Sequence, residues 1–455
     1  MLPYDHLAAF RLGYGLSPHL TLPADPQAVA GSVTAATRPG PDDVTMDRVR
    51  AWQMEGQDLN RNRREKLPDA DEAFRTHRQE MNHIFRRAVV ERFARAVDDA
   101  PGFGERLVWF WADHFTVAGR NHYTNLMTEA LVSEAIRPHL TGRFAQMMVA
   151  AETHPAMLTY LDQSRSIGPN SIQARRNPDR AGGLNENLAR EMIELHSLGA
   201  GAAYEQQDIE ELAALLTGLA YYPRQPGVFQ RQRAEPGAET VLGTSYGGRK
   251  GTLDDIRAVI DDLAVHPATA AHLARKMAVH FVADDPPQAL VDRLTAVFMD
   301  TGGDLGAMNL TLAEAPELET HFRAKMRQPF EFLVAGLRSL GLDGAQVRDL
   351  RPRIMNTRLL QPMAIMGQPW ASPQGPDGWP EEAEVWASPQ GLATRINWAL
   401  AAPVDLVGRL PDARRFLQTC LGDSASETLA WAVPRAESQS DGVALVLASA
   451  DFNRR

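Results

Sequence analysis

The sequence predicts a mainly α-helical protein of two lobes with one small β-hairpin. Apolar residues recur at helical spacing through most of the chain from Ala73 onward. Only residues 228–242 have the pattern of a hairpin. The 455 residues also exceed the size at which a single hydrophobic core stops growing. We therefore expect one continuous domain in three parts: an N-terminal helical lobe over 1–222, a hairpin and connector over 223–251, and a C-terminal helical lobe over 252–455.

In the N-terminal lobe, a polar opening rich in Pro and Gly extends to about Asp71 and precedes a series of helices. The helices are expected at 73–97, with a buried stripe of Met81, Phe85, Ala88 and Phe93, at 105–117, which is apolar nearly all round, and through 124–151. Residues 163–183, with several Gly, Pro and Arg residues, are expected to form a long loop, which in a compact protein is either functional or disordered.

The hairpin follows a helix expected over 207–219. Its strands are expected at 228–233 and 240–242, around a turn at 235–237. Thr252 and Asp255 then have the spacing of a helix-capping box, so helices resume there. They continue to the C-terminus, interrupted by a segment rich in Pro, Gly and Trp over 361–386 that is expected to pack on the core.

Composition excludes several classes of protein. A formal net charge of −10 argues against a nucleic-acid partner, because phosphates favour a basic surface. The single cysteine, Cys420, leaves no partner for an intrachain disulfide and rules out a cysteine-rich metal site. No apolar run approaches the roughly 20 residues that a membrane-spanning helix needs. We expect no membrane span.

The N-terminal residues 1–11 have neither the basic start nor the apolar stretch of a secretory signal. As written, the chain is expected to be cytoplasmic. A truncated start would leave export open.

The segment from Asn185 to Gly199 is dense in polar groups that are costly to bury. At 3.6 residues per turn, its apolar residues fall on one side of a helix: Leu188, Met192 and Leu195. Its polar residues fall together on the other side: Asn187, Arg190, Glu191 and Glu194. Two carboxylates, a guanidinium and an amide therefore share one face.

Two interpretations of this polar face stay open. In the structural one, Arg190 bridges Glu186 and Glu194, each four residues away, in a buried ion network. In the functional one, the carboxylates act in acid–base chemistry or hold a divalent cation as cofactor. The candidate catalytic residues are Glu191, Glu194 and His114. The candidate metal ligands are Glu191, Glu194 and Asp113, and the candidate residues for binding an anion or substrate are Arg190, Arg175, Arg176 and Asn187.

Asp113 and His114 lie within the apolar helix expected over 105–117. Both are expected to be desolvated and therefore paired, because burying a polar group without a partner costs roughly 1–3 kcal/mol. The structural interpretation of His114 is a core histidine bonded to a backbone carbonyl or a carboxylate.

Two further motifs have plain explanations. Residues 243–247 match the Gly-x-Ser-x-Gly elbow of serine hydrolases, but residues 248–251 separate Ser245 from the next helix, so a chance match is expected. Lys276 and His280, four residues apart, are expected at the solvated edge of an amphipathic helix.

Several motifs together resemble the bacterial family known as domain of unknown function 1800. They lie at 111–115, 185–199, 216–218, 266–270, 325–331, 367–369, 378–380 and 447–452, and so span essentially the whole chain. Two positions depart from the family pattern. The hairpin turn, often His-Asp-Pro-Gly in relatives, starts with Ala234 here, and Ala112 replaces a usual polar residue. A site that used the turn histidine would be incomplete in this chain.

The resemblance implies no established reaction. It implies a genomic association with a sulfatase-like family, and a protein partner would come from that family. The same association implies a link to exported or surface polymers. We expect a non-catalytic helical scaffold or accessory protein. The alternative is a metal-dependent, hydrolase-like enzyme that uses the carboxylates and His114. A haem protein is the third alternative, because Asp-His followed later by Asn-Glu resembles animal peroxidases, although their fixed spacing is missing.

Overall fold

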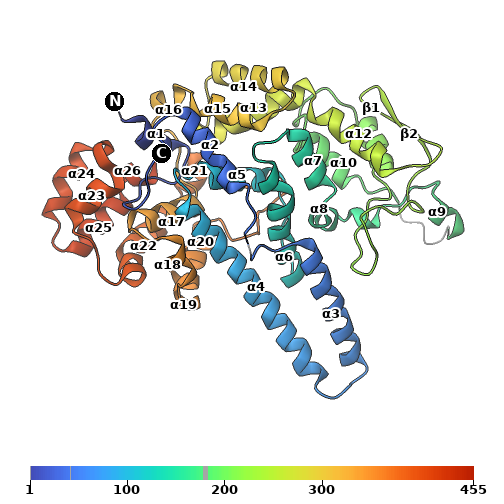
Figure 1. Cartoon of the computed structure of the whole chain (residues 1–455), viewed down its shortest axis with the longest axis horizontal. Helices are drawn as coiled ribbons and strands as arrows, with labels where there is room; N and C mark the ends of the chain where they lie inside the picture. The colour runs from blue at the N-terminus through green and yellow to red at the C-terminus, as the bar shows by residue number, and fades with distance from the viewer. Residues whose placement is uncertain (1, 41, 178–182) are drawn as a thin grey trace.

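The computed structural model describes residues 2–40, 42–177 and 183–455. It confirms the predicted fold class, because helices dominate and the strands among these residues form a single two-stranded hairpin. Figure 1 shows an elongated molecule with the hairpin at one end, the last helices at the other, and an arm projecting from the middle. The arm consists of α3 (Met46–Arg64) and α4 (Ala70–Asp98).

The first half of the chain is helical almost from its start. The other helices before the hairpin are α1 (Tyr4–Arg11), α2 (Pro26–Ala36), α5 (Phe103–His114), α6 (His122–Leu131), α7 (Phe144–Glu152), α8 (Pro155–Tyr160), α9 (Ile172–Arg176), α10 (Asn187–Glu194) and α11 (Gln206–Leu215), with the short π or 3-10 turns η1 (Val132–Ile136), η2 (Arg137–His139) and η3 (Gln163–Arg165). The long loop expected over 163–183 thus contains η3 and α9, and its residues 178–182 lie outside the described residues.

Helices begin well before residue 73, where the first one was expected, because α1, α2 and α3 lie within the polar opening up to Asp71. Helix α2 shows why. The Asp25 carboxylate caps it by accepting a bond from the Ala28 amide at 2.8 Å, and Pro26 occupies its first position, where proline is tolerated. Its residues Val29 and Val33 are buried. A helix cap and an apolar stripe are therefore enough to form a helix in a segment rich in Pro and Gly.

The hairpin lies later than expected. Its strands are β1 (Gly237–Val241) and β2 (Thr244–Gly248), which pair antiparallel. Leu242 and Gly243 form the turn with positive φ angles of 50° and 77°, the geometry of a two-residue hairpin loop. The strand expected at 228–233 is wrong, because Arg233 turns inward there and donates to the carbonyls of Ser164 and Ser166. Ser245 lies within β2, so the serine elbow is not formed.

The second half is again helical. It contains α12 (Leu253–Ala264), α13 (Pro267–Phe281), α14 (Gln288–Thr301), α15 (Leu305–Ala313), α16 (Glu317–Thr320), α17 (Pro329–Ser339), α18 (Gly344–Arg348), α19 (Pro352–Ile354), α20 (Gln361–Ile365), α21 (Ala383–Trp386), α22 (Pro389–Val407), α23 (Ala413–Leu421), α24 (Glu427–Ala432), α25 (Gln439–Ala448) and α26 (Ala450–Asn453), with the π or 3-10 turns η5 (Met355–Leu360), η6 (Gly422–Ser424) and η7 (Val433–Arg435). The predicted capping box of Thr252 and Asp255 is confirmed at the start of α12.

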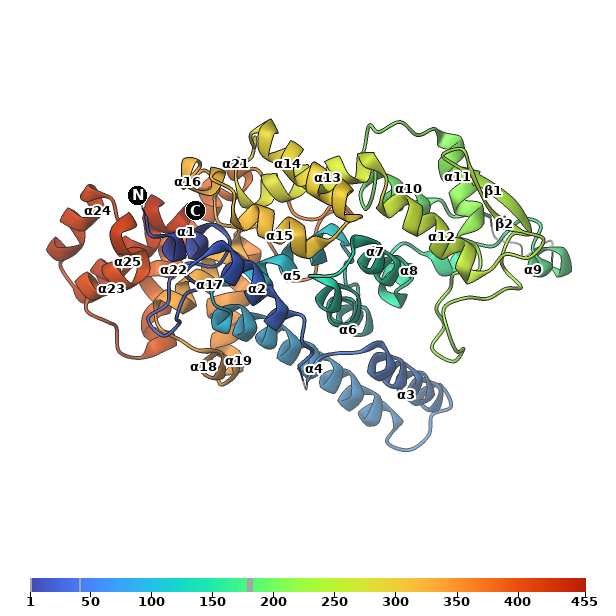
Figure 2. The same cartoon turned by 45° about the horizontal axis from the view of Figure 1, so that its top comes forward.

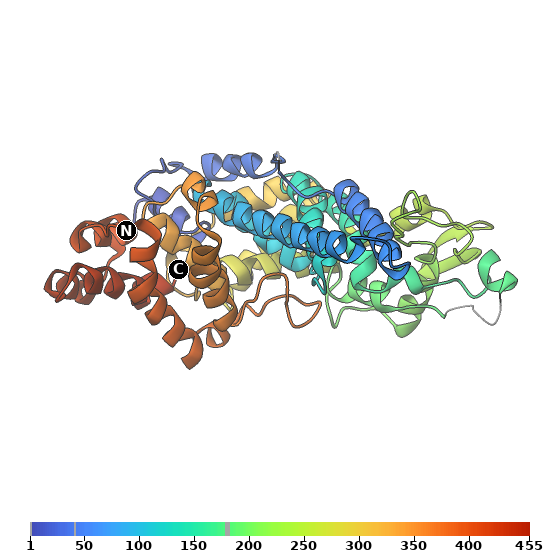
Figure 3. The same ribbon diagram turned by 90° about the horizontal axis from the view of Figure 1, so that it is seen from below.

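Buried apolar side chains form two clusters that meet at α1. Leu7 and Leu12 belong to the cluster around α5, α7 and α13, while Phe10 and Tyr14 belong to the one around α17 and α22. The rotated views in Figures 2 and 3 show α5 between the two groups of helices. The division of the chain at 222 and 252 stays a prediction.

The tryptophan-rich segment packs on the core, as expected. Trp370 contacts Trp109 and Phe93, and Trp386 is buried. Within the described ranges, no helix combines the length and the apolar character that crossing a membrane requires.

Candidate functional site

The predicted site residues come from α10 and from the C-terminal end of α5. Helix α10 forms as predicted, although it is shorter than the segment from Asn185 to Gly199. Its apolar side is buried at Leu188 and Met192. The end of α5 presents His114 toward α13 and the segment after α10, and its neighbour Asp113 toward the backbone of Trp379. The three elements therefore meet at one polar centre.

Arg190 makes the predicted bridge. Its Nη1 lies 3.2 Å from Glu194 Oε1, and its Nη2 lies 3.1 Å from Glu186 Oε2. The expectation that this network is buried was wrong, because the Arg190 side chain is 39% exposed. The polar side of α10 faces solvent, and Gln206 of α11 extends the network by bonding both Arg190 and Glu186. A half-exposed network of this kind contributes little to stability.

Glu191 is the acid on this helix for which no partner is found among the described residues. Burial raises its pKa, the neighbouring His196 acts in the opposite direction, and the negative charge of Glu194 raises it further. The structure thus brings Glu191 and Glu194 close together, as predicted. His114 lies deeper, behind His196.

Both ring nitrogens of His114 are engaged. Nε2 lies 3.2 Å from the carbonyl oxygen of His196 and donates to it, while Nδ1 accepts from the Lys276 ammonium at 3.1 Å. Burial, together with the nearby charge of Lys276, lowers the pKa of His114, so the ring is neutral. The predicted bond from a core histidine to a backbone carbonyl is confirmed. With both nitrogens in use, this ring offers no lone pair to a metal or a haem iron.

His196 extends the centre toward α7. Its Nδ1 donates to Glu152 Oε1 at 2.7 Å, and both side chains are almost completely buried. The backbone carbonyl of the same residue accepts the bond from His114. His196 therefore ties α5, α7 and the end of α10 together. Sequence reasoning missed Glu152, because it lies at the end of an ordinary amphipathic helix, α7.

Lys276 and His280 are not at a solvated edge, and that expectation was wrong. His280 is buried, and its Nδ1 donates to Glu381 Oε1 at 2.5 Å. Lys276 keeps only a small exposed surface and reaches His114. Burial lowers its pKa, although Asp113, Glu381 and Asp377 oppose the shift.

Asp113 is held by the segment after Gly378. The amide of Trp379 donates to both carboxylate oxygens, at 3.0 and 3.2 Å. Gly378 has φ of +84°, and a Cβ on it would lie 2.6 Å from Asp113 Oδ1, so only glycine fits. Burial raises the pKa of Asp113 to about 8, against the opposing charge of Lys276. Asp113 and Lys276 therefore have opposite pKa shifts at one partly exposed position.

The other predicted residues do not join this centre. Arg175 and Arg176 are exposed on α9, at the outer edge of the molecule (Figures 1 and 2), and Gln173 of that helix bonds the carbonyl of Gln232. Asn187 is exposed at the start of α10. Across residues 2–40, 42–177 and 183–455, no three His, Cys, Asp or Glu side chains are arranged to hold a metal ion. The proposed ligands Glu191, Glu194 and Asp113 are thus not gathered into a metal site.

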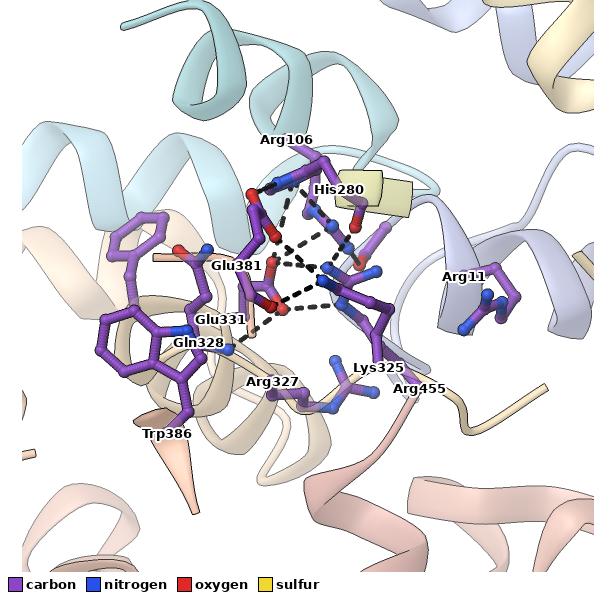
Figure 4. A network of polar contacts seen from close by, with 12 residues as sticks. Arg11, Arg106, His280, Lys325, Arg327, Gln328, Glu331, Glu381, Trp386 and Arg455 are labelled. Carbon is purple, nitrogen blue, oxygen red and sulfur yellow. Dashed lines mark hydrogen bonds and ion pairs between the residues drawn. The ribbon is translucent and has the colours of Figure 1, made fainter. Parts of the chain in front are cut away.

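A second polar network lies one turn further along α13, around His280 (Figure 4). At its centre the Glu331 carboxylate is contacted by Arg106 Nη2 at 3.1 Å and by Arg455 Nε at 2.8 Å. Lys325 Nζ lies 2.5 Å from Asp284 and 3.2 Å from Glu381. All of these residues stood outside the predicted site, although Lys325 and Glu331 are the two ends of the family motif at 325–331.

A large groove lies beside the arm, between α4 and the segment from α18 to η5. It has a volume of about 880 Å³. Its floor is apolar, with Ile84, Val90, Leu350, Met355 and Leu360. Its charged residues are five arginines and two acids: Arg48, Arg86, Arg87, Arg348, Arg353, Asp42 and Glu91. The groove is therefore basic, although the chain as a whole carries a charge of −10.

The two acids of the groove are already paired. Asp42 accepts from Arg87 Nη2 at 3.0 Å, and Glu91 accepts from Arg348 Nε at 2.7 Å. Arg48 and Arg86 donate only to backbone carbonyls, and Arg353 makes no side-chain bond within the described residues. Three exposed guanidinium groups are thus left without an acid.

Comparison with known proteins gives one family. The sequence profile of the family described as "Protein of unknown function (DUF1800)" matches residues 7–454. No curated protein and no solved structure matches the chain.

We predict that an excess of EDTA leaves the melting temperature unchanged, because Arg190 pairs with Glu186 and Glu194 and the acids of the described residues form no metal site. A bound cation would instead contribute RT ln(1 + [L]/Kd), or roughly 2.7 kcal/mol at a hundredfold excess over Kd. In the same melting experiments, Arg190→Met should cost less than about 1 kcal/mol, similar to the exposed control Arg257→Met. A fall in melting temperature with EDTA would contradict this account.

We further predict that Asp113→Asn increases the free energy of unfolding, and more so at pH 8 than at pH 5. The pKa of Asp113 is about 8 in the folded protein and roughly 4 in an unfolded chain. The folded state therefore favours the protonated acid, and stability is lost as pH rises from about 4 through 8. Asparagine does not ionise and can still accept the Trp379 bond.

Urea unfolding at both pH values measures this difference, with the exposed Asp254→Asn as the control. An equal effect of Asp113→Asn at both pH values would contradict the assignment.

Proposed function

This chain belongs to the family of proteins of unknown function DUF1800, and we propose that it is a non-catalytic helical scaffold. Membership of this family does not indicate a reaction, so the proposal rests on the structure. The scaffold holds an acidic amphipathic segment of a partner protein in the groove beside α4. The observation that carries the proposal is this groove, with its apolar floor and its excess of arginine.

The groove matches an amphipathic segment in both its components. The floor residues Val90, Met355 and Leu360 are side chains that pack against apolar anchors of a bound helix. Arg86, Arg353 and Arg48 supply charge for acidic residues along the other side of that helix, and guanidinium groups bind carboxylates in a fixed geometry. An acidic polysaccharide would satisfy the arginines but would leave the apolar floor uncovered.

The state of three of the four predicted catalytic or metal-binding residues, all but Glu191, also supports a scaffold. His114 is neutral and doubly bonded, and Glu194 is paired with Arg190. The Asp113 carboxylate accepts a hydrogen bond from the backbone amide of Trp379. Each of these groups has a structural partner that explains its position.

One observation favours a second candidate, an enzyme without the metal that the sequence suggested. Asp113 and Lys276 have opposite pKa shifts and keep some exposed surface, which is a common arrangement for groups that exchange a proton with a substrate. In that case Asp113 would be the acid and Lys276 the base.

The scaffold proposal is tested with synthetic peptides of defined charge. A labelled amphipathic helical peptide with glutamates on its polar face should bind the full-length protein in fluorescence anisotropy. The same peptide with lysines in place of the glutamates should not bind. Arg86→Glu combined with Arg353→Glu should weaken binding of the acidic peptide at least about tenfold, since each lost charge-assisted contact contributes roughly 1.5 kcal/mol or more.

The matched control is Arg75→Glu combined with Arg78→Glu. It makes the same change of charge at two exposed positions outside the groove, both on α4, the helix that carries Arg86. Equal loss in both double variants would show only a general effect of charge and would contradict the proposal. If the protein bound heparin but not the acidic peptide, the ligand of the groove would be an anionic polymer and the proposal of a protein partner would be wrong.

A further inference from the structure

The buried network around Glu331 contains more positive than negative charge. Four cationic side chains lie in it, those of Arg106, Lys325, Arg327 and Arg455, and a fifth, that of Arg11, lies beside it. Three carboxylates face them, those of Glu331, Glu381 and Asp284. His280 adds no charge, because burial lowers its pKa. With Arg11 counted, the network therefore has two positive charges in excess.

These cations are inside the protein rather than at its surface. Arg11, Arg106 and Arg455 each have a relative exposure of 0%. Lys325 and Arg327 are each 1% exposed. A buried charge without a counter-charge costs several kcal/mol, because water no longer solvates it. The excess therefore needs an explanation.

Several of the guanidinium nitrogens also lack hydrogen-bond partners. Within the described residues, the buried nitrogens without a partner include Arg11 Nε, Arg11 Nη1, Arg106 Nε, Arg327 Nη1 and Arg455 Nη1. Arg11 is the clearest case, since its single bond is from Nη2 to the carbonyl of Val282, at 2.6 Å. Figure 4 shows Arg11 beside the network with no contact to the other residues drawn.

The four arginines are close enough to affect one another. Burial lowers the pKa of Arg11 first, and the positive charges of Arg455, Arg106 and Arg327 lower it further. Arginine nevertheless keeps its proton in proteins. Four guanidinium groups thus remain charged and near one another, with Glu331 as the carboxylate that they share.

We propose that the arginines of this network, Arg11, Arg106, Arg327 and Arg455, bind a small inorganic anion. The ligand is a halide or a tetrahedral oxyanion such as phosphate or sulfate. Either would accept bonds from the unpartnered N–H groups and would offset the excess charge. Water alone would satisfy the N–H groups but would leave the charge uncompensated. An oxyanion has more acceptors and suits planar guanidinium groups, which bind pairs of oxygens.

The test compares anions at constant ionic strength. The full-length protein is first dialysed into sodium gluconate, and chloride, sulfate or phosphate then replaces gluconate stepwise. At least one of these anions should raise the melting temperature by about 2–4 °C with saturation, because it binds the native state. The anion that saturates at the lowest concentration identifies the ligand as a halide or an oxyanion. An equal, unsaturated rise with every anion would overturn the proposal.

Variants assign the effect to the network. Arg11→Gln removes a cation that makes no ion pair within the described residues, and it should abolish the saturable rise. The matched control is Arg338→Gln. Arg338 is equally buried, bonds only the backbone carbonyls of Ala96 and Asp99, and also has unpartnered nitrogens, but it stands outside this network. Retention of the rise in Arg11→Gln would overturn the proposal.

A direct measurement covers the case in which Arg11→Gln fails to fold. Equilibrium dialysis of the wild-type protein against radiolabelled phosphate, and separately against radiolabelled chloride, should give one bound equivalent of one anion. Absence of stoichiometric binding for both would overturn the proposal.

Discussion

The burial of one carboxylate, that of Glu331, is the constraint on which the arrangement of the helices depends. Burial alone would raise its pKa, but the guanidinium groups of Arg106 and Arg455 hold that pKa at about 2. Arg106 stands on α5, Glu331 on α17, and Arg455 follows α26, so one ionised group connects three elements that are remote in sequence. The same carboxylate accepts the amide of Gln328 in the capping box of α17.

The polar features of the molecule differ in how completely their charges are paired. On α10, Arg190 is matched by Glu186 and Glu194, and the result is a surface network. In the groove and in the Glu331 network, arginines outnumber acids, so both are places where an external negative charge is favoured. The difference between them is access. The groove is open at the surface, whereas the arginines of the interior network are buried.

The sequence predicted the features that depend on local spacing. Helices, the cap at Thr252 and the bridge by Arg190 all follow from residues three or four positions apart. It misplaced the hairpin, because the turn is decided by the positive φ of Leu242 and Gly243 rather than by the Pro-Gly pair. It could not place Lys276 or Glu331, since their partners His114 and Arg106 are 162 and well over 200 residues away along the chain. The periodicity of a sequence shows which side of a helix is apolar. It does not show which charged residue, far away in the sequence, lies next to a given lysine.

The most direct test of this account is the free energy of unfolding of Glu331→Gln, measured with urea beside the surface control Glu194→Gln. The substitution keeps the size of the side chain and leaves Arg106 and Arg455 without their shared counter-charge. We expect a loss of about 3–5 kcal/mol, as for other buried ion pairs from which one partner is removed. Glu194→Gln should lose less than about 1 kcal/mol. Equal and small losses in both variants would show that the Glu331 carboxylate does not hold these elements together, and would contradict the account.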